Sequence, residues 1–339
     1  MSDDAQAEDH LIGQRLMVGF DGVRWNADLA FCIRELLPGG LILFAANIET
    51  PDQVRQLCND AQKCAADAGL PPLIIAVDQE GGPVARLRPP AFPEFKGPAE
   101  MSTTADADTF ASLAAETLLP IGINMDMAPV LDLDCPAVDS VMRTRAFGPD
   151  PETVTTMGLA LMEGLQRRGI MAVAKHFPGI GRTTLDSHLD RPDLDTDRDT
   201  LLHEDGAPFR AAVSGGVAGV MLSHIRYMAL DPDWPASLSE KVVQQLLRQE
   251  MGYAGVVMTD DLDMGAIERH YPAEVLLERI VLAGVDIALI CHKGPRRDLA
   301  RQHLAEAIEK NERTEEHQNS VRRILALKQR YLTAAWKGI

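Results

Sequence analysis

Acidic, basic and imidazole side chains follow short apolar runs at several separate places in this 339-residue chain. Asp78 follows one run, Lys175 and His176 a second, His224 a third and Asp260 a fourth. A carboxylate can act as a nucleophile, an imidazole can transfer a proton near neutral pH, and a lysine can bind a ligand or form a Schiff base. Such residues at the ends of several apolar runs indicate an active site rather than isolated ion pairs.

The longest polar loop begins at Lys175 and reads KHFPGIGRTTLDSHLDRP. Its prolines and glycines favour turns. Asp186 and His188 stand two residues apart in this loop, close enough for the carboxylate to orient the imidazole. A carboxylate that holds one ring nitrogen makes the other a defined proton donor or acceptor. Such a pair could act as an acid and a base, but an Asp and a His at this spacing can also do no more than satisfy backbone amides, so the loop alone leaves both possibilities open.

Eight short apolar runs are available to position these residues. They are mostly continuous rather than alternating, which is typical of strands buried on both faces of a parallel sheet. The predicted strands are Met17–Phe20, Leu41–Phe44, Leu73–Val77, Ile123–Met127, Met171–Ala174, Gly219–Leu222, Gly255–Met258 and Asp286–Ile290.

Segments with helical spacing lie between these runs. They include Pro51–Ala68, Asp106–Leu119, Pro151–Arg168, Leu238–Met251 and Ala273–Ala283. The alternation predicts an α/β fold, a single (β/α)8 TIM-type barrel that forms one catalytic domain over residues 1–339, with a doubly wound open sheet as the alternative. We expect an extra C-terminal helix over about 312–332 to pack on the outside of the barrel. In a barrel the carboxyl ends of all strands meet at one face, which would gather the polar residues.

Charge and composition exclude several classes of function. The chain carries 33 Lys+Arg against 50 Asp+Glu, a net charge of −17, so binding to nucleic acid or to an anionic membrane is not expected. The acidic first ten residues and the lack of a long apolar run predict a cytoplasmic protein. Five cysteines without a CxxC pair do not indicate a zinc cluster.

Several motifs together resemble glycoside hydrolase family 3, and more narrowly its single-domain β-N-acetylhexosaminidase branch. In their order along the chain, these motifs are IGQRLMVGF, DQEGG, APVLDL, KHFPGIG followed after four residues by DSH, TDDLDM and AGVDIALIC. The motifs occur in the same order in the family. That branch has KHFPGHG and then DSH. This chain departs from the family pattern at Ile180, Pro83 and Arg143.

The resemblance implies a retaining exo-glycosidase that removes terminal, non-reducing β-linked N-acetylglucosamine without a cofactor or metal. It implies Asp260 as the nucleophile, His188 as the acid/base and Asp186 as its partner. The positions that it implies for sugar binding are Asp78, Arg86, Arg145, Lys175 and His176. It also implies recycling of cell-wall muropeptides in the cytoplasm, and we expect a monomer that acts on a small carbohydrate.

Other interpretations remain open at this point. The same site suits a β-N-acetylglucosaminide phosphorylase, a β-glucosidase-like activity or a catalytically silent sugar-binding protein. A metal-dependent hydrolase would use His176, His188, His224 and Asp260 as ligands. A Schiff-base lyase would use Lys175.

Overall fold

The computed structural model describes residues 11–184 and 192–332. Eight parallel strands form one sheet in the order β10-β1-β2-β3-β4-β5-β7-β9, and a parallel bridge between Met258 and Ile287 brings the two ends together. The strands are β1 (Leu16–Val18), β2 (Gly40–Leu43), β3 (Ile74–Val77), β4 (Met125–Asp126), β5 (Met171–Phe177), β7 (Gly219–Leu222), β9 (Val256–Thr259) and β10 (Ala288–Ile290). The predicted (β/α)8 barrel is therefore confirmed.

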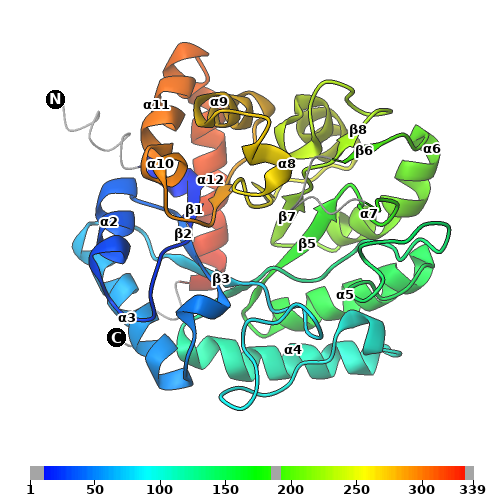
Figure 1. Cartoon of the computed structure of the whole chain (residues 1–339), viewed down its shortest axis with the longest axis horizontal. Helices are drawn as coiled ribbons and strands as arrows, with labels where there is room; N and C mark the ends of the chain where they lie inside the picture. The colour runs from blue at the N-terminus through cyan, green and yellow to red at the C-terminus, as the bar shows by residue number, and fades with distance from the viewer. Residues whose placement is uncertain (1–10, 185–191, 333–339) are drawn as a thin grey trace.

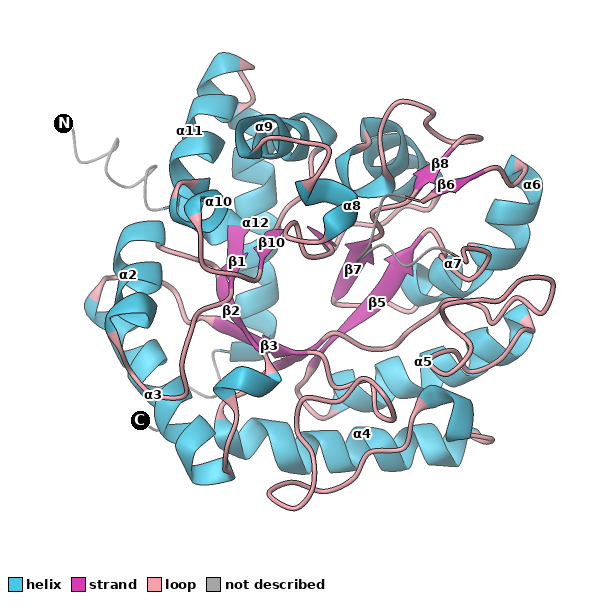
Figure 2. Cartoon of the chain, viewed as in Figure 1, coloured by secondary structure: helices cyan, strands magenta, loops and turns pink. Residues whose placement is uncertain are grey.

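Helices surround the strands, as Figure 2 shows. The α-helices are α2 (Ala27–Leu36), α3 (Pro51–Asp67), α4 (Thr104–Leu118), α5 (Pro151–Arg167), α6 (Arg198–Thr200), α7 (Ala207–Ser214), α8 (Gly265–Glu268), α9 (Ala273–Ala283), α10 (Pro295–Asp298), α11 (Ala300–Lys310) and α12 (Thr314–Leu332). Two further helices, η5 (Leu201–Asp205) and η7 (Lys241–Glu250), have π-type hydrogen bonding, and short 3₁₀ turns are η1 (Gly13–Arg15), η2 (Ala45–Asn47), η3 (Pro98–Glu100), η4 (Leu119–Ile121) and η6 (Ala236–Leu238).

Local signals explain where several of these helices begin. The Thr50 side chain accepts a hydrogen bond from the Gln53 N–H, and Pro51 occupies the first turn of α3. At the start of α5, the Asp150 side chain accepts a hydrogen bond from the Thr153 N–H, and Pro151 occupies the first turn. A side-chain cap satisfies one backbone N–H that the helix leaves open, and proline suits the first turn because it has no N–H to satisfy.

A small parallel ribbon that the sequence did not predict stands beside the barrel. It pairs β6 (Asp193–Leu194) with β8 (Arg226–Tyr227), and Arg226 forms an ion pair with Asp193. The pairing holds residues 193–194 beside residues 226–227, which follow β7.

The barrel interior is filled largely by methionine and branched aliphatic side chains. They form one buried cluster that includes Met17, Ile42, Ile74, Met125, Met127, Met171, Met221, Met258 and Leu289. A second and larger buried cluster lies between the outer surface of the barrel and the helices. The interior is thus a packed core, as small barrels require, and not a pore.

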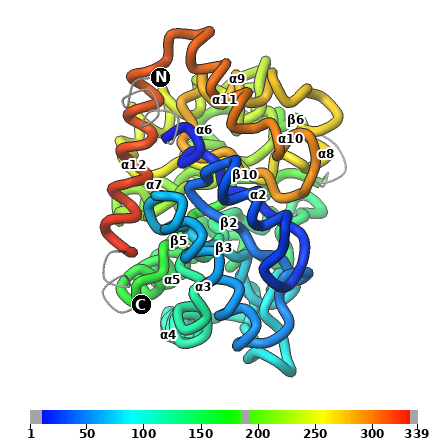
Figure 3. Tube along the Cα trace, turned by 90° about the vertical axis from the view of Figure 1, so that its left-hand side faces the viewer, coloured from blue at the N-terminus to red at the C-terminus, as the bar shows by residue number. Residues whose placement is uncertain are grey.

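The predicted place of the C-terminal helix on the outside of the barrel was wrong. Ile324, Leu327 and Leu332 of α12 belong to the same buried cluster as the barrel-interior side chains, so α12 covers the amino-terminal end of the barrel. Lys328 of α12 donates to Gln14 just before β1, and Arg323 pairs with Asp286 just before β10. Figure 3 shows α12 along one edge of the molecule, beside the strands.

None of the helices in the described ranges combines the length and apolar character that crossing a bilayer requires.

Candidate active site

A cavity of about 390 Å³ opens at the carboxyl ends of the strands, a size within the usual range for small-molecule sites. Six of the eight sequence-predicted site residues line it, and they come from five different places in the chain: Asp78, Arg86, Arg145, Lys175, His176 and Asp260. The other two, Asp186 and His188, lie outside the described residues.

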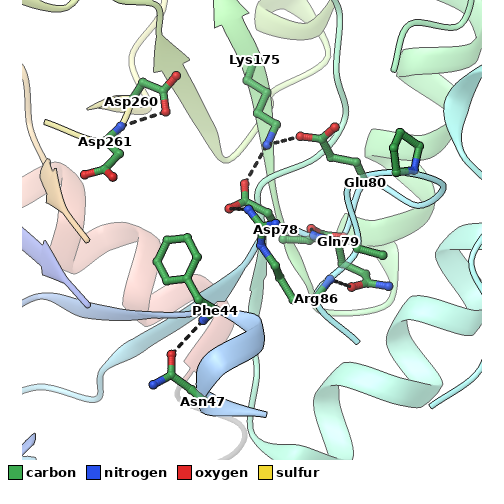
Figure 4. Close-up of polar contacts among 12 residues, drawn as sticks. Phe44, Asn47, Asp78, Gln79, Glu80, Arg86, Lys175, Asp260 and Asp261 are labelled. Atoms are coloured by element: carbon green, nitrogen blue, oxygen red, sulfur yellow. Dashed lines mark hydrogen bonds and ion pairs between the residues drawn. The ribbon is translucent and has the colours of Figure 1, made fainter. Parts of the chain in front are cut away.

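Lys175 lies between two carboxylates that line the cavity with it (Figure 4). Its Nζ is 2.8 Å from Asp78 Oδ1 and 2.6 Å from Glu80 Oε1, and its side chain is 2% exposed. Asp78 also accepts from Arg86, and Glu80 accepts two hydrogen bonds from Arg145 at 2.9 and 2.8 Å. Three cations and two anions therefore share one buried network, which holds each side chain in place.

The charges of this network oppose the effect of burial on each pKa. Burial alone would raise the pKa of Asp78, but Lys175 and Arg86 outweigh it and hold that pKa below its usual range. Burial also raises the pKa of Glu80, and Lys175 and Arg145 reverse the shift to leave it lowered to about 2. Burial lowers the pKa of Lys175, yet the two carboxylates raise it above its usual value. All three groups are charged at neutral pH.

This charge state of Lys175 does not suit a Schiff-base lyase. A lysine that attacks a carbonyl must be unprotonated, which enzymes achieve by lowering its pKa. Here two carboxylates raise the pKa instead.

His176 is held in place by Asp132, which the sequence analysis did not assign to the site. Asp132 Oδ2 is 2.7 Å from His176 Nδ1, and the same carboxylate accepts from the backbone N–H groups of His176 and Ile180. With Nδ1 engaged, Nε2 is the ring nitrogen that can serve a ligand in the cavity. The signal for Asp132 was its place in the APVLDL segment, six residues after the end of β4.

Glu80 was also missed, although it lies in the DQEGG motif two residues after Asp78. The neighbouring Gln79 has a structural task, because its Oε1 accepts from the N–H groups of Arg86 and Leu87 and so fixes the turn that carries Arg86. Asp126, a strand-end carboxylate in the sequence, does not line the cavity. It is fully buried and accepts from the Gln79 N–H, and burial raises its pKa well above the usual value.

His224 does not take part in the cavity either. Its Nδ1 is 2.8 Å from Ser237 Oγ and its Nε2 is 2.8 Å from the Asp261 carbonyl oxygen. Both ring nitrogens are thus engaged, so the metal-ligand set that includes His224 does not form in this arrangement. Nor is His224 placed to give a proton to a ligand.

Asp260 directly follows β9 and faces the cavity from the side opposite Lys175 in Figure 4. Its N–H donates to Leu222 O, which continues the ladder between β9 and β7, and its Oδ1 accepts from the Asp261 N–H at 2.8 Å. Among the described residues, no backbone N–H donates to the other oxygen of this carboxylate. A fixed carboxylate at a strand end, across from a cluster of cations, can attack an electrophilic carbon of a ligand held between them.

Of the three departures from the family pattern, only Ile180 lines the cavity. Arg143 lies at the surface in an exposed ion pair with Asp139, and Pro83 is exposed. The cavity is also lined by apolar side chains, which include Phe44, Val141, Ile225 and Met264.

Comparison with known proteins gives consistent matches along nearly the whole chain. Residues 8–327 match the glycosyl hydrolase family 3 N terminal domain. A beta-hexosaminidase of Alkalilimnicola ehrlichii is 35% identical over 85% of this chain and 84% of its own. Beta-hexosaminidase A of Pseudoalteromonas piscicida is 34% identical over 94% of this chain, which spans only 60% of that relative.

Solved structures agree in fold. A glycoside hydrolase family 3 beta-N-acetylglucosaminidase of a Paenibacillus species superposes with a TM-score of 0.92 at 37% identity, covering 98% of this chain and 64% of its own. A beta-N-acetylhexosaminidase of Beutenbergia cavernae gives a TM-score of 0.86 at 28% identity, covering 95% and 98% of the two chains.

Proposed function

The chain belongs to glycosyl hydrolase family 3, and from this premise we propose that it is a β-N-acetylhexosaminidase that removes terminal, non-reducing β-linked N-acetylglucosamine with retention of configuration. The observation that carries the proposal is the cavity at the strand ends. In it Asp260 faces the Asp78–Lys175–Glu80 network across a space that suits one sugar.

In the proposed reaction, an oxygen of Asp260 attacks the anomeric carbon as the glycosidic bond breaks and the leaving oxygen takes a proton. Water then attacks the same carbon, gives a proton back to the group that protonated the leaving oxygen, and releases the Asp260 carboxylate. Two inversions thus give net retention. Asp78, Arg86, Arg145, Lys175 and His176 bind the hydroxyl groups of the terminal sugar. These contacts hold the anomeric carbon in reach of Asp260, which converts binding into proximity.

Replacing Asp260 tests the nucleophile. Asp260→Asn should abolish turnover of nitrophenyl β-N-acetylglucosaminide while leaving the thermal unfolding of the protein unchanged, because Asp260 lies at a strand end and Asn keeps the oxygen that accepts from the Asp261 N–H. A fluorinated substrate analogue should label the wild type on the peptide that contains Asp260, as mass spectrometry would show. Labelling at Asp261 or Asp263 would overturn the assignment.

For the proton donor we propose His188, oriented by Asp186, on the basis of the DSH motif. A positioned acid/base contributes on the order of 10²–10⁴ in rate. His188→Ala should therefore severely slow cleavage of an alkyl or sugar aglycone and affect a nitrophenyl aglycone less, because nitrophenolate leaves without a proton.

Asp186→Ala should show the same order of effects more weakly, since Asp186 acts only through the imidazole. The measurement is the ratio of kcat/KM for the two leaving groups in each variant. Equal losses on both substrates would mean that the proton comes from elsewhere.

Four alternatives on the same site are separated by simple assays. Turnover that depends on inorganic phosphate would indicate a phosphorylase, and a preference for nitrophenyl β-glucoside would indicate a β-glucosidase-like enzyme. Binding of N-acetylglucosamine without turnover would indicate a silent sugar-binding protein. Activity that persists in a chelator would exclude a metal-dependent hydrolase.

The cellular role that we propose is the recycling of muropeptides in the cytoplasm by a monomer. It is supported by the bacterial origin of the similar beta-hexosaminidases and by a cavity that suits a single sugar. Release of N-acetylglucosamine from purified muropeptide fragments would test it.

A further inference from the structure

Asp261, the residue after the proposed nucleophile, is connected to three neighbouring strand ends. Its backbone N–H donates to Asp260 Oδ1 at 2.8 Å, and its backbone carbonyl accepts from His224 Nε2 at 2.8 Å, just after β7. Its carboxylate Oδ1 accepts from the Cys291 N–H at 3.1 Å, just after β10. The peptide that holds Asp260 is therefore anchored on both sides of β9.

The carboxylate of Asp261 also stabilises the turn formed by residues 261–263. Oδ1 accepts from the Asp263 N–H at 3.0 Å, in addition to the Cys291 N–H. Asp261 is one of the residues that line the cavity, and Figure 4 shows its carboxylate on the far side of the Asp260 carboxylate from Lys175. The contacts of Oδ1 are thus with backbone N–H groups, while Oδ2 lies 3.6 Å from Nδ1 of the exposed His292.

We propose that Asp261 is a positioning residue for the nucleophile: its carboxyl group ties the turn after β9 to the end of β10, and so fixes the N–H that holds Asp260 Oδ1. This inference rests on the proposed function of Asp260. A nucleophile held by a fixed donor keeps its other oxygen aimed at the anomeric carbon and needs no reorganisation in the transition state.

The protonation behaviour of Asp261 agrees with a role in geometry rather than in charge. Burial, followed by the charges of Asp263 and Asp260, raises the pKa of the Asp261 carboxyl to about 6. The surroundings of this carboxyl therefore disfavour its negative charge without abolishing it near neutral pH. Its acceptor oxygen, which an amide also provides, is what the turn uses.

Two variants separate geometry from charge. Asp261→Asn keeps the acceptor oxygen and removes the charge, whereas Asp261→Ala removes both. We expect Asp261→Ala to lower kcat ~10–100-fold with KM within about threefold of the wild type, because the lost interaction acts on the chemical step. Asp261→Asn should stay within about threefold of the wild type. Labelling of Asp260 by the fluorinated analogue should slow in Asp261→Ala as much as kcat does.

Glu268→Gln is the matched control, since it removes an exposed carboxylate from nearby α8 and should leave all rates unchanged. Should Asp261→Ala fail to fold, Asp261→Ser replaces it, because a serine hydroxyl is too short to reach the Cys291 N–H. Wild-type kcat in Asp261→Ala, or equal losses in the Ala and Asn variants, would overturn the inference. A wild type that neither turns over nor labels at Asp260 would overturn the proposed function instead, whatever the variants do.

Discussion

Lys175 shows how a site of five charged side chains can be buried at the end of a barrel. An unpaired ammonium at 2% exposure would be strongly disfavoured, but two carboxylates contact it and two guanidinium groups satisfy those carboxylates in turn. Each charge in the network is satisfied by another member, so removing one side chain leaves a buried charge without its partner. Loss of one member therefore affects both ligand binding and the stability of the fold.

Lys175→Ala should raise KM and lower kcat for nitrophenyl β-N-acetylglucosaminide, because contacts present in both ground and transition states are lost. It should also lower the free energy of unfolding by ~3–5 kcal/mol, since Asp78 and Glu80 are left buried without their shared partner. Urea unfolding and steady-state kinetics would measure the two effects. Lys63→Ala, at an exposed position on α3, should change neither.

An effect of Lys175→Ala on kcat alone, with unchanged KM, would instead give Lys175 a chemical role.

The sequence was informative about the residues that face the ligand and less so about those behind them. Asp78, Lys175 and Asp260 stand at the ends of apolar runs, so the barrel topology alone predicts that they meet. Glu80 and Asp132 were missed because they act on other side chains, and a linear sequence does not show which cation a carboxylate will reach. The burial of His224 against Ser237 and Asp261 could not be foreseen for the same reason.

At the scale of elements, continuous apolar runs located all eight barrel strands, because such strands must be apolar on both faces. Their ends were less predictable: β4 is only Met125–Asp126, whereas β5 continues to Phe177. The amphipathic pattern of α12 predicted which face of the helix is buried but not which part of the barrel that face packs against. Only the tertiary structure shows that this face meets the end of the barrel rather than its side.

Lys328 on that face provides a test by pH. It is buried, its Nζ donates to Gln14, and burial lowers its pKa to about 7. Between this value and the ordinary lysine pKa the unfolded chain binds a proton that the folded chain does not, so this group makes stability rise with pH over that interval. At pH 7 and below its destabilising effect is complete.

Lys328→Met should therefore stabilise the protein by ~1–4 kcal/mol at pH 7, and by less at pH 9.5. Urea unfolding at both pH values measures the difference. Lys63→Met should have no more than a small effect at either pH. A gain from Lys328→Met that is equal at the two pH values would show that the buried amine is not the cause.

At the scale of the whole molecule, the two ends of the barrel have different tasks. The carboxyl end carries the site and the amino end is covered by α12, in agreement with the general division between function and stability in such barrels. Ile324 of α12 is fully buried against the interior cluster, far along the barrel axis from the cavity. The two ends should therefore respond independently to mutation.

Ile324→Ala should lower the free energy of unfolding by ~2–5 kcal/mol, through lost burial and the cavity that remains. At a temperature where the variant is folded, kcat/KM should equal that of the wild type. Arg322→Ala, on the exposed face of the same helix, controls for helix propensity. A loss of kcat/KM in folded Ile324→Ala would show that the packing of α12 is coupled to the site.

The floor of the cavity is formed by Ile42, Met221 and Leu289, which belong to the same packed cluster that continues down to α12. This packed interior closes the barrel axis beneath the cavity, so a polysaccharide cannot thread along that axis. Such an enzyme cannot be processive: after each cut the monosaccharide blocks the site until it departs, and the shortened chain must rebind. On a long polymer it would leave the viscosity of the solution almost unchanged while free sugar accumulates, one unit for each encounter.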